Sequence, residues 1–159
     1  TQTYFWIGSH GVARTYPEDA ALDVANTLFG GRFTSMLNTA LRVESGLTYG
    51  ASSRLMRPTR PGSVAIVSFT ATDNTAAAID LALQTLDRFT QAAADDAQLR
   101  SAKTYIRGQN PLGFETAAQV AGQLTSLAFY GQDRAVIDGY DAAVASVDQA
   151  GFARTIGAV

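Results

Sequence analysis

Short apolar runs and alternating apolar positions predict three β-strands in the first 70 residues. The run 4–7 is apolar and aromatic and is closed by a glycine, as strands often are. Apolar or small residues at every second position over 47–55 predict a second strand with one buried face. Residues 64–69 are apolar on both faces, which is typical of a central strand. The proline-containing segment 58–62 is expected to form the turn between the last two strands.

Helical spacing predicts two helices between the first and second strands. Pro17, followed by two acidic residues, suits the first turn of a helix, and the glycine pair at 30–31 is expected to end it. Thr34 or Ser35 can cap the next helix. Gly46 is expected to stop that helix in the left-handed conformation.

From Asp73 onward the apolar spacing is helical, and the clearest stripe covers 117–128. Ser146 with Gln149 could form a capping box for a last short helix. Strands early in the chain and helices late in it indicate the α+β class. We therefore expect a small antiparallel-rich sheet packed against several helices.

Composition excludes several classes of function. The 159 residues suit one domain, and the absence of cysteine excludes disulfides and thiolate metal sites. The net charge is −2 and no dense basic cluster is present, so we expect no nucleic acid as a partner. No apolar run approaches about 18 residues, so we expect no membrane span.

Few residues are candidates for metal or acid–base chemistry. A zinc site needs about three converging protein ligands, but His10 is the one histidine, and we expect it to be a loop residue. Glu44 has no second acid placed near it by the sequence. The pair at 95–96 is best interpreted as the acidic N-terminus of a helix. We therefore expect no metal site in this domain.

Arg42 and Tyr49 are the candidate site residues. Each has an ordinary interpretation: Arg42 can complement the carbonyl end of its helix or pair with Glu44, and Tyr49 can be a half-buried strand residue. Taken together, separated by the break at Gly46, they can bring both side-chain tips to one sheet edge. The five-donor fork of arginine and the O–H of tyrosine suit peptide carbonyls and the oxyanion of a tetrahedral intermediate.

The block GGRFTSMLNTALRVESGLTYG at 30–50 resembles the second, non-zinc domain of the pitrilysin/insulinase-type zinc metallopeptidases, the inverzincins. The resemblance extends more weakly over 1–148. In that family an arginine and a tyrosine at this spacing reach a zinc-bearing partner domain and hold the substrate peptide. The resemblance implies a metallopeptidase half-domain fold, and catalytic and substrate-binding roles for Arg42 and Tyr49. It also implies that a homologous domain or subunit supplies the zinc, with no cofactor in this domain.

The resulting hypothesis is the substrate-clamping half of a two-domain or two-subunit zinc metallopeptidase that cleaves peptides or unfolded proteins. This half is expected to be inactive alone because His-x-x-Glu-His is absent. The alternative is an inactive scaffold or assembly subunit of the same fold. We expect 1–159 to be a single domain excised from a longer chain and lacking the final strand of the family. Within the family, the chain most resembles bacterial two-subunit peptidases. We therefore expect a bacterial protein of the cytoplasm or the periplasm.

Overall fold

A computed structural model of the protein describes residues 1–92 and 94–157. Strands β1 (Gln2–His10), β2 (Ala51–Met56) and β3 (Ser63–Ala71) form one antiparallel sheet in the order β1-β3-β2. The central position predicted for 64–69 is therefore confirmed. The expected lack of a final strand concerns the end of the chain, where residues 158–159 lie outside the described residues.

Helices make up most of the remaining chain, which confirms the α+β class. They are α1 (Asp19–Asn26), α2 (Met36–Asn38), α3 (Thr75–Gln91), α4 (Asp96–Gln109), α5 (Ala117–Tyr130), α6 (Ala135–Asp138), α7 (Tyr140–Ser146) and α8 (Gln149–Ile156). Helices α1 and α2 continue as the π-helical turns η1 (Thr27–Gly31) and η2 (Thr39–Glu44). Short 3-10 turns precede α3 and α5, as η3 (Thr72–Asn74) and η4 (Asn110–Phe114).

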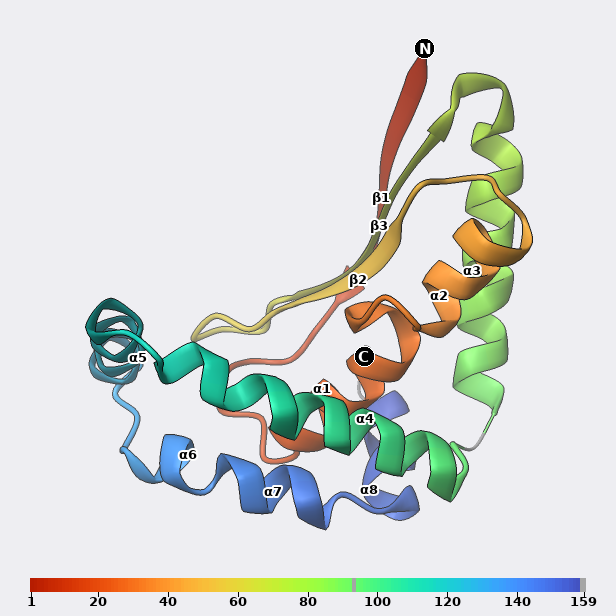
Figure 1. The fold of residues 1–159 in the computed structure, drawn as a ribbon. Coiled ribbons are helices and arrows are strands. Elements are labelled where there is room, and N and C mark those ends of the chain that lie inside the picture. Colours follow the sequence, from red (N-terminus) through yellow and green to blue (C-terminus); the bar gives the residue numbers. More distant parts are fainter. Residues whose placement is uncertain (93, 158–159) are drawn as a thin grey trace.

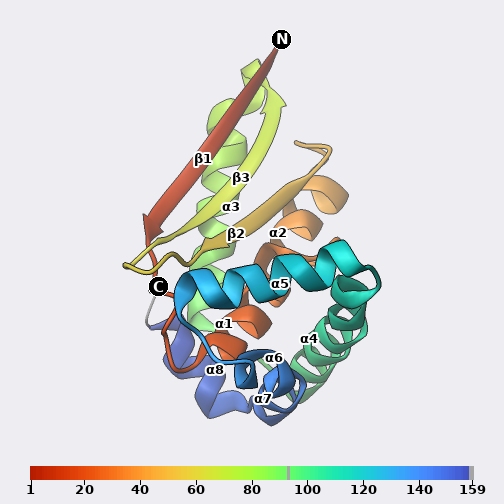
Figure 2. The same cartoon turned by 90° about the vertical axis from the view of Figure 1, so that its left-hand side faces the viewer.

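The sheet has one face covered by helices and one open face. In β2 the side chains of Ala51 and Ser53 point to the covered face and are buried. The side chain of Arg54, the residue after Ser53, points to the open face and is exposed. Figure 1 shows α2 and α3 along the covered face, and Figure 2 shows the three strands with α3 behind them. Helices α4 and α5 extend away at the foot of the sheet, so that the molecule is L-shaped with the open face inside the angle (Figure 1).

The core lies between the covered face of the sheet and the helices. Phe89 of α3 packs with Phe29 of η1 at a centroid distance of 5.0 Å and with Phe152 of α8 at 5.8 Å, so one aromatic chain joins three elements. The largest fully buried apolar side chains come from α1, α2, η2 and α7: Leu22, Val24, Leu37, Leu41 and Val144. Burying side chains of this size contributes about 1.5–3 kcal/mol each.

The strand predicted over 47–55 begins only at Ala51, so the expected strand position of Tyr49 is wrong. The Thr48 hydroxyl accepts a hydrogen bond from the Gly50 amide at 3.1 Å and donates to the Gly50 carbonyl at 3.0 Å. This local bonding bends the chain and ends the alternation of faces that the sequence suggested. The Tyr49 side chain is 76% exposed rather than half-buried.

The helix caps were predicted with mixed success. Ser35 caps α2 by accepting from a backbone amide of that helix, and Asp95 forms a capping box with Gln98 at the start of α4. The expected role of Ser146 in the last helix is wrong, because Asp148 caps α8 by accepting from the Gly151 amide at 2.7 Å. Ser146 instead ends α7, where its hydroxyl bonds to a carbonyl of its own helix.

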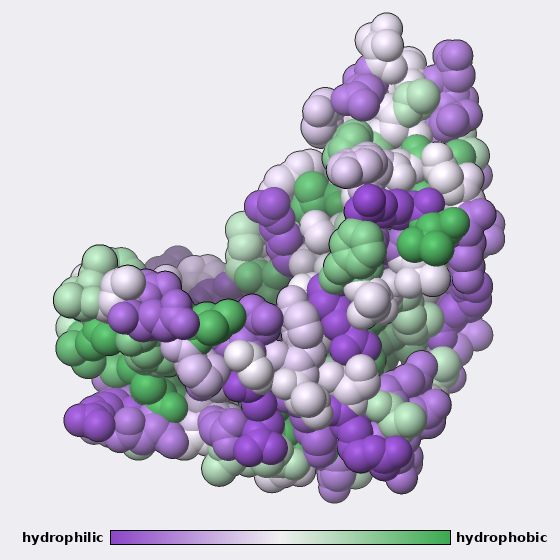
Figure 3. Space-filling model, viewed as in Figure 1, coloured by the Kyte–Doolittle hydropathy of each residue, from purple (hydrophilic) through white to green (hydrophobic). Residues whose placement is uncertain are grey.

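The apolar stripe predicted over 117–128 falls on α5, and most of it lies on the surface. Leu127 is buried, but Leu124 is 51% exposed and Phe129 is 78% exposed. Figure 3 shows apolar surface over this arm, at the left of the view. Helix α5 packs mainly against the η4 turn that precedes it. Within the part of the chain that the structure describes, no helix is long and apolar enough to cross a membrane.

Gly30 is required because η1 passes very close to β2. A Cβ at this position would lie 2.4 Å from the Ser53 backbone nitrogen. We expect Gly30→Ala to lower the free energy of unfolding by about 1–3 kcal/mol, the usual effect of an added methyl group in a packed site. Urea unfolding measures this change.

Gly122 provides the matched control, because a Cβ there meets open space on α5. Gly122→Ala should be neutral or should stabilise the chain by up to about 1 kcal/mol. Equal stabilities of the two variants would contradict the close approach of η1 and β2.

Candidate functional site

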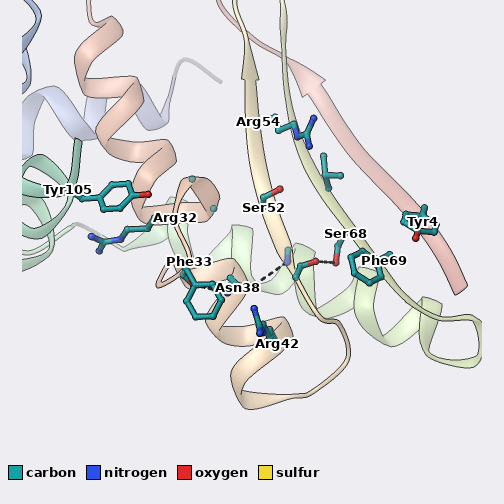
Figure 4. A pocket seen from close by; sticks show the side chains of 15 residues that line it. Tyr4, Arg32, Phe33, Asn38, Arg42, Ser52, Arg54, Ser68, Phe69 and Tyr105 are labelled. Atoms are coloured by element: carbon teal, nitrogen blue, oxygen red, sulfur yellow. Dashed lines mark hydrogen bonds between the residues drawn. The ribbon is translucent and has the colours of Figure 1, made fainter. Parts of the chain in front are cut away.

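A groove of about 550 Å³ opens at the junction of the open sheet face, the turns η1 and η2, and helix α4. Figure 4 shows its side chains, which come from all three strands and from the segments around η1, η2 and α4. The lining includes Tyr4, Arg32, Phe33, Asn38, Arg42, Ser52, Arg54, Ser68, Phe69 and Tyr105. The groove therefore combines aromatic rings, hydroxyl and amide groups, and three guanidinium groups.

Arg42 lines this groove and is in direct contact with Tyr49, which is not among the lining residues. Arg42 is in the last turn of η2, as predicted for a helix end. Its guanidinium carbon is 4.3 Å from the centroid of the Tyr49 ring and 4.6 Å from that of Phe33, so the cation lies against two rings. None of the ion pairs among the described residues involves Arg42, so the alternative pairing with Glu44 is not formed.

Buried hydroxyl groups of β3 fix the segment that carries Tyr49. The Thr70 hydroxyl donates to the Leu47 carbonyl at 2.6 Å, and the Ser68 hydroxyl donates to the Gly50 carbonyl at 3.0 Å. Both side chains are 2% exposed. Gly46 begins this segment with φ of 65°, the left-handed conformation predicted from the sequence. Tyr49 is thus exposed on a segment whose two ends are anchored to the central strand.

Asn38 connects the two walls of the groove. Its side chain is 3% exposed. Its Nδ2 donates to the Phe33 carbonyl at 2.7 Å, and its Oδ1 accepts from the Ala51 amide at 3.2 Å. The buried Asn38 amide therefore fixes the backbone of Phe33, whose ring contacts Arg42, and it also fixes the start of β2.

Sequence reasoning gave no role to Arg32 or Arg54. Arg32 follows η1, donates from Nη1 to the Ser101 hydroxyl at 2.9 Å, and lies 6.0 Å from the centroid of the Tyr105 ring. Arg54 projects from β2 and lies 5.5 Å from the centroid of the Trp6 ring. Alternation along β2 could have placed Arg54 on the open face. No local signal brings α4 beside the residue that follows η1.

The chemistry of the groove is that of a binding site. Three arginines line it, and no aspartate, glutamate or histidine is among the described lining residues. Guanidinium and hydroxyl donors can hold carbonyl oxygens and anions. The lining lacks a side chain whose ordinary pKa lies near neutrality, which general acid–base catalysis requires. The groove can therefore orient a ligand and stabilise negative charge.

Possible zinc ligands are scattered over the described residues. Among residues 1–92 and 94–157, no three histidine, cysteine, aspartate or glutamate side chains come together as metal ligands. The expectation that His10 is a loop residue is wrong, because it is the last residue of β1, paired with Ser63 and exposed. A single exposed imidazole does not meet the ligand requirement of zinc.

A second polar cluster joins α1, α7 and the segment after β2. Arg57 forms ion pairs with Asp19 and with Asp23, the latter at 2.8 Å, and the Tyr140 hydroxyl donates to Asp23 at 2.8 Å. Burial raises the pKa of Asp19, and burial also raises the pKa of Tyr140. Because the acids are paired within the cluster, we interpret it as a structural connection between the helices and the end of the sheet.

The chain was compared with known proteins. The family described as peptidase M16 inactive domain matches residues 1–106. No curated protein matches the sequence. A solved peptidase M16 inactive domain from Pseudomonas fluorescens has the same fold, with a TM-score of 0.88 and 21% identity. The match covers 98% of this chain and 37% of that one.

Two further solved structures are similar at lower identity. A protease from Helicobacter pylori has a TM-score of 0.85 and 16% identity, over 98% of this chain and 38% of that one. The periplasmic protease PqqL from Escherichia coli has a TM-score of 0.76 and 15% identity, over 98% of this chain and 17% of that one. At these identities the likeness establishes the fold. The chain spans little more than a third of the first two structures.

Asn38 provides a test of how the groove is held. Asn38→Ala leaves the Ala51 amide and the Phe33 carbonyl without their partner, so we expect the free energy of unfolding to fall by about 1–3 kcal/mol. Urea unfolding is the measurement. Asn74→Ala is the control, because Asn74 is exposed and its side chain makes no capping bond. A similar loss in both variants would show that the Asn38 bonds contribute nothing specific.

Proposed function

The chain belongs to the peptidase M16 family as an inactive domain, and from this membership we propose that it is the substrate-clamping half of a zinc metallopeptidase. A homologous zinc-bearing domain, in the same chain or in a second subunit, would supply the metal and the general base. The substrate would be a peptide or an unfolded protein. Arg42 and Tyr49 would complete the active site from this side.

The contact between Arg42 and Tyr49 is the observation that carries the proposal. The guanidinium lies against two rings, so its orientation is restricted before a ligand binds. Tyr49 is 76% exposed and is not itself a lining residue of the groove, but its ring contacts Arg42, which is. Two donors held in this way suit a peptide carbonyl and the negative charge that develops on it during hydrolysis.

The side chains present support the proposed division into two halves. The groove contains donors, but the described lining contains no acid or base for proton transfer. The chain also spans about 37% of the related inactive-domain structure, which leaves room for a second homologous unit in such proteins. We propose a bacterial two-domain or heterodimeric peptidase. The similarity to a periplasmic protease favours the periplasm over the cytoplasm.

A scaffold or assembly subunit of the same fold is the second candidate. The exposed apolar side chains of α5, among them Leu124 and Phe129, favour this candidate because large exposed apolar patches often mark protein–protein contacts. A scaffold needs the partner surface but not the Arg42–Tyr49 donors. Activity measurements on the assembled protein separate the two candidates.

Reconstitution tests the division of labour. We expect no peptide cleavage by this chain alone, and cleavage of an unfolded protein substrate when it is mixed with its zinc-bearing partner. A chelator should abolish the activity of the mixture. Chelator-sensitive cleavage by the isolated chain would overturn the proposal. A mixture that assembles and never cleaves would identify the chain as a scaffold.

The Tyr49 hydroxyl is tested by Tyr49→Phe in the reconstituted enzyme. The ring that contacts Arg42 is retained, so folding should be unchanged, while kcat should fall about 10²–10³-fold, as for loss of one oxyanion donor. Tyr16→Phe is a control outside the groove. Arg42→Lys should also impair turnover, because it keeps the charge and loses the fork. Full activity of Tyr49→Phe, or a loss explained by unfolding, would sink the clamp hypothesis.

A further inference from the structure

We propose that the groove selects peptides with acidic side chains, and that Arg32 and Arg54 are its specificity-determining residues. The proposal rests on the proposed clamping of a peptide at Arg42 and Tyr49, and it adds the chemical class of the substrate. Arg32 and Arg54 would bind carboxylates on either side of the clamped peptide bond.

The distribution of charge is the first observation. The chain has a net charge of −2, yet its groove is lined by three arginines and by no carboxylate among the described residues. The ion pairs of the described chain involve other arginines, which lie at Arg57, Arg107, Arg134 and Arg154. Three cations are therefore gathered in one groove without anionic partners. A ligand carboxylate supplies the missing charge.

The rings beside the arginines are the second observation. Each groove arginine lies over an aromatic ring: Arg42 at Tyr49, Arg54 at Trp6, and Arg32 at Tyr105. A ring against the flat face of a guanidinium holds the side chain in place and does not occupy its N–H edges, although in Arg32 Nη1 is bound to Ser101 and Nε is buried. Those edges match a carboxylate with two parallel hydrogen bonds. The arginines are thus oriented for planar anions before a ligand arrives.

Arg32 provides a third observation. Its Nε is a buried side-chain donor without a hydrogen-bond partner, whereas its Nη1 is bound to Ser101. A buried donor without an acceptor is unfavourable, which favours a shift of the Arg32 side chain that brings Nε to a ligand oxygen in the groove. Figure 4 shows Arg32, Arg42 and Arg54 on three different sides of the groove. An extended peptide that passes Arg42 can therefore meet a second arginine.

A peptide is favoured over a nucleic acid as the ligand. Non-specific nucleic-acid binding depends on many phosphate contacts from dense basic surfaces. This chain has 12 basic residues against 14 acidic ones. Three arginines in one groove suit two or three carboxylates rather than a phosphate backbone.

The test uses the fluorescence of Trp6, the single tryptophan of the chain, whose ring lies beside Arg54. The probes are two eight-residue peptides without aromatic residues, identical except that one has two glutamates where the other has two glutamines. At about 20 mM salt we expect the glutamate peptide to bind roughly five- to tenfold more tightly, as two exposed charge pairs allow. The preference should shrink at about 300 mM salt because of screening.

Variants assign the preference to the groove. Arg54→Gln and Arg32→Gln should each reduce it about two- to fourfold, as loss of one exposed pair allows. Arg60→Gln removes the same charge from an exposed position outside the groove and should leave the preference unchanged. Since Arg54 contacts Trp6, isothermal titration calorimetry, which does not depend on that ring, confirms the affinities of that variant.

Several outcomes would overturn the proposal: no binding of the glutamate peptide, equal binding of both peptides, an equal loss in Arg60→Gln, or tighter binding of a 12-nucleotide single-stranded DNA. The assay measures binding without cleavage, so it separates the two hypotheses. Selective binding with no cleavage by the reconstituted pair would remove the proposed function alone. Cleavage without a glutamate preference would remove this inference alone.

Discussion

The packing of the π-helical turn η1 and of helix α2, which continues as η2, against the edge strand β2 determines where the side chains of the groove lie. Gly30 lets η1 approach the backbone of Ser53, and Asn38 ties the start of β2 to the segment before α2. Arg32 follows the first turn and Arg42 ends the second, so the position of both cations depends on this packing. π-Helical turns are rare and occur frequently at functional sites. In this chain they bring residues of two separate helical segments to the same groove.

The parts of the fold that local sequence determines were predictable. Ser35 and Asp95 act as caps because a short polar side chain reaches amides in its own first turn, and Gly46 adopts the left-handed conformation that other residues avoid. The sequence predicted that Arg42 and Tyr49 would come to one sheet edge; they do come into contact, but from η2 and from a bent segment that precedes β2. The catalytic role of this pair stays a prediction.

The parts that depend on distant residues were not predictable from local pattern. Tyr49 fails to join β2 because Thr48, held near Ser68, bonds to Gly50, and the spacing of apolar positions contains no sign of this turn. The exposed stripe of α5 shows a second limit: the pattern identifies an apolar helix face but not what covers it. The contact of Arg32 with Tyr105 joins residues that are far apart in the sequence, and only the tertiary packing of α4 creates it.

The three groove arginines lack anionic partners within the described part of the chain, and the aromatic rings that contact them offset only part of that cost. Cations placed near one another repel, and no carboxylate of the described lining offsets that repulsion. The rings of Trp6, Tyr49 and Tyr105 provide partial compensation by cation–π contact, worth about 0.5–1 kcal/mol each at exposed sites. A ring cannot satisfy N–H donors, so the guanidinium edges of Arg42 and Arg54 stay available for oxygen, whereas Arg32 already uses Nη1 on Ser101. An orientation fixed before binding lowers the entropy lost when a ligand arrives, and this is the property that a clamp requires of its donors.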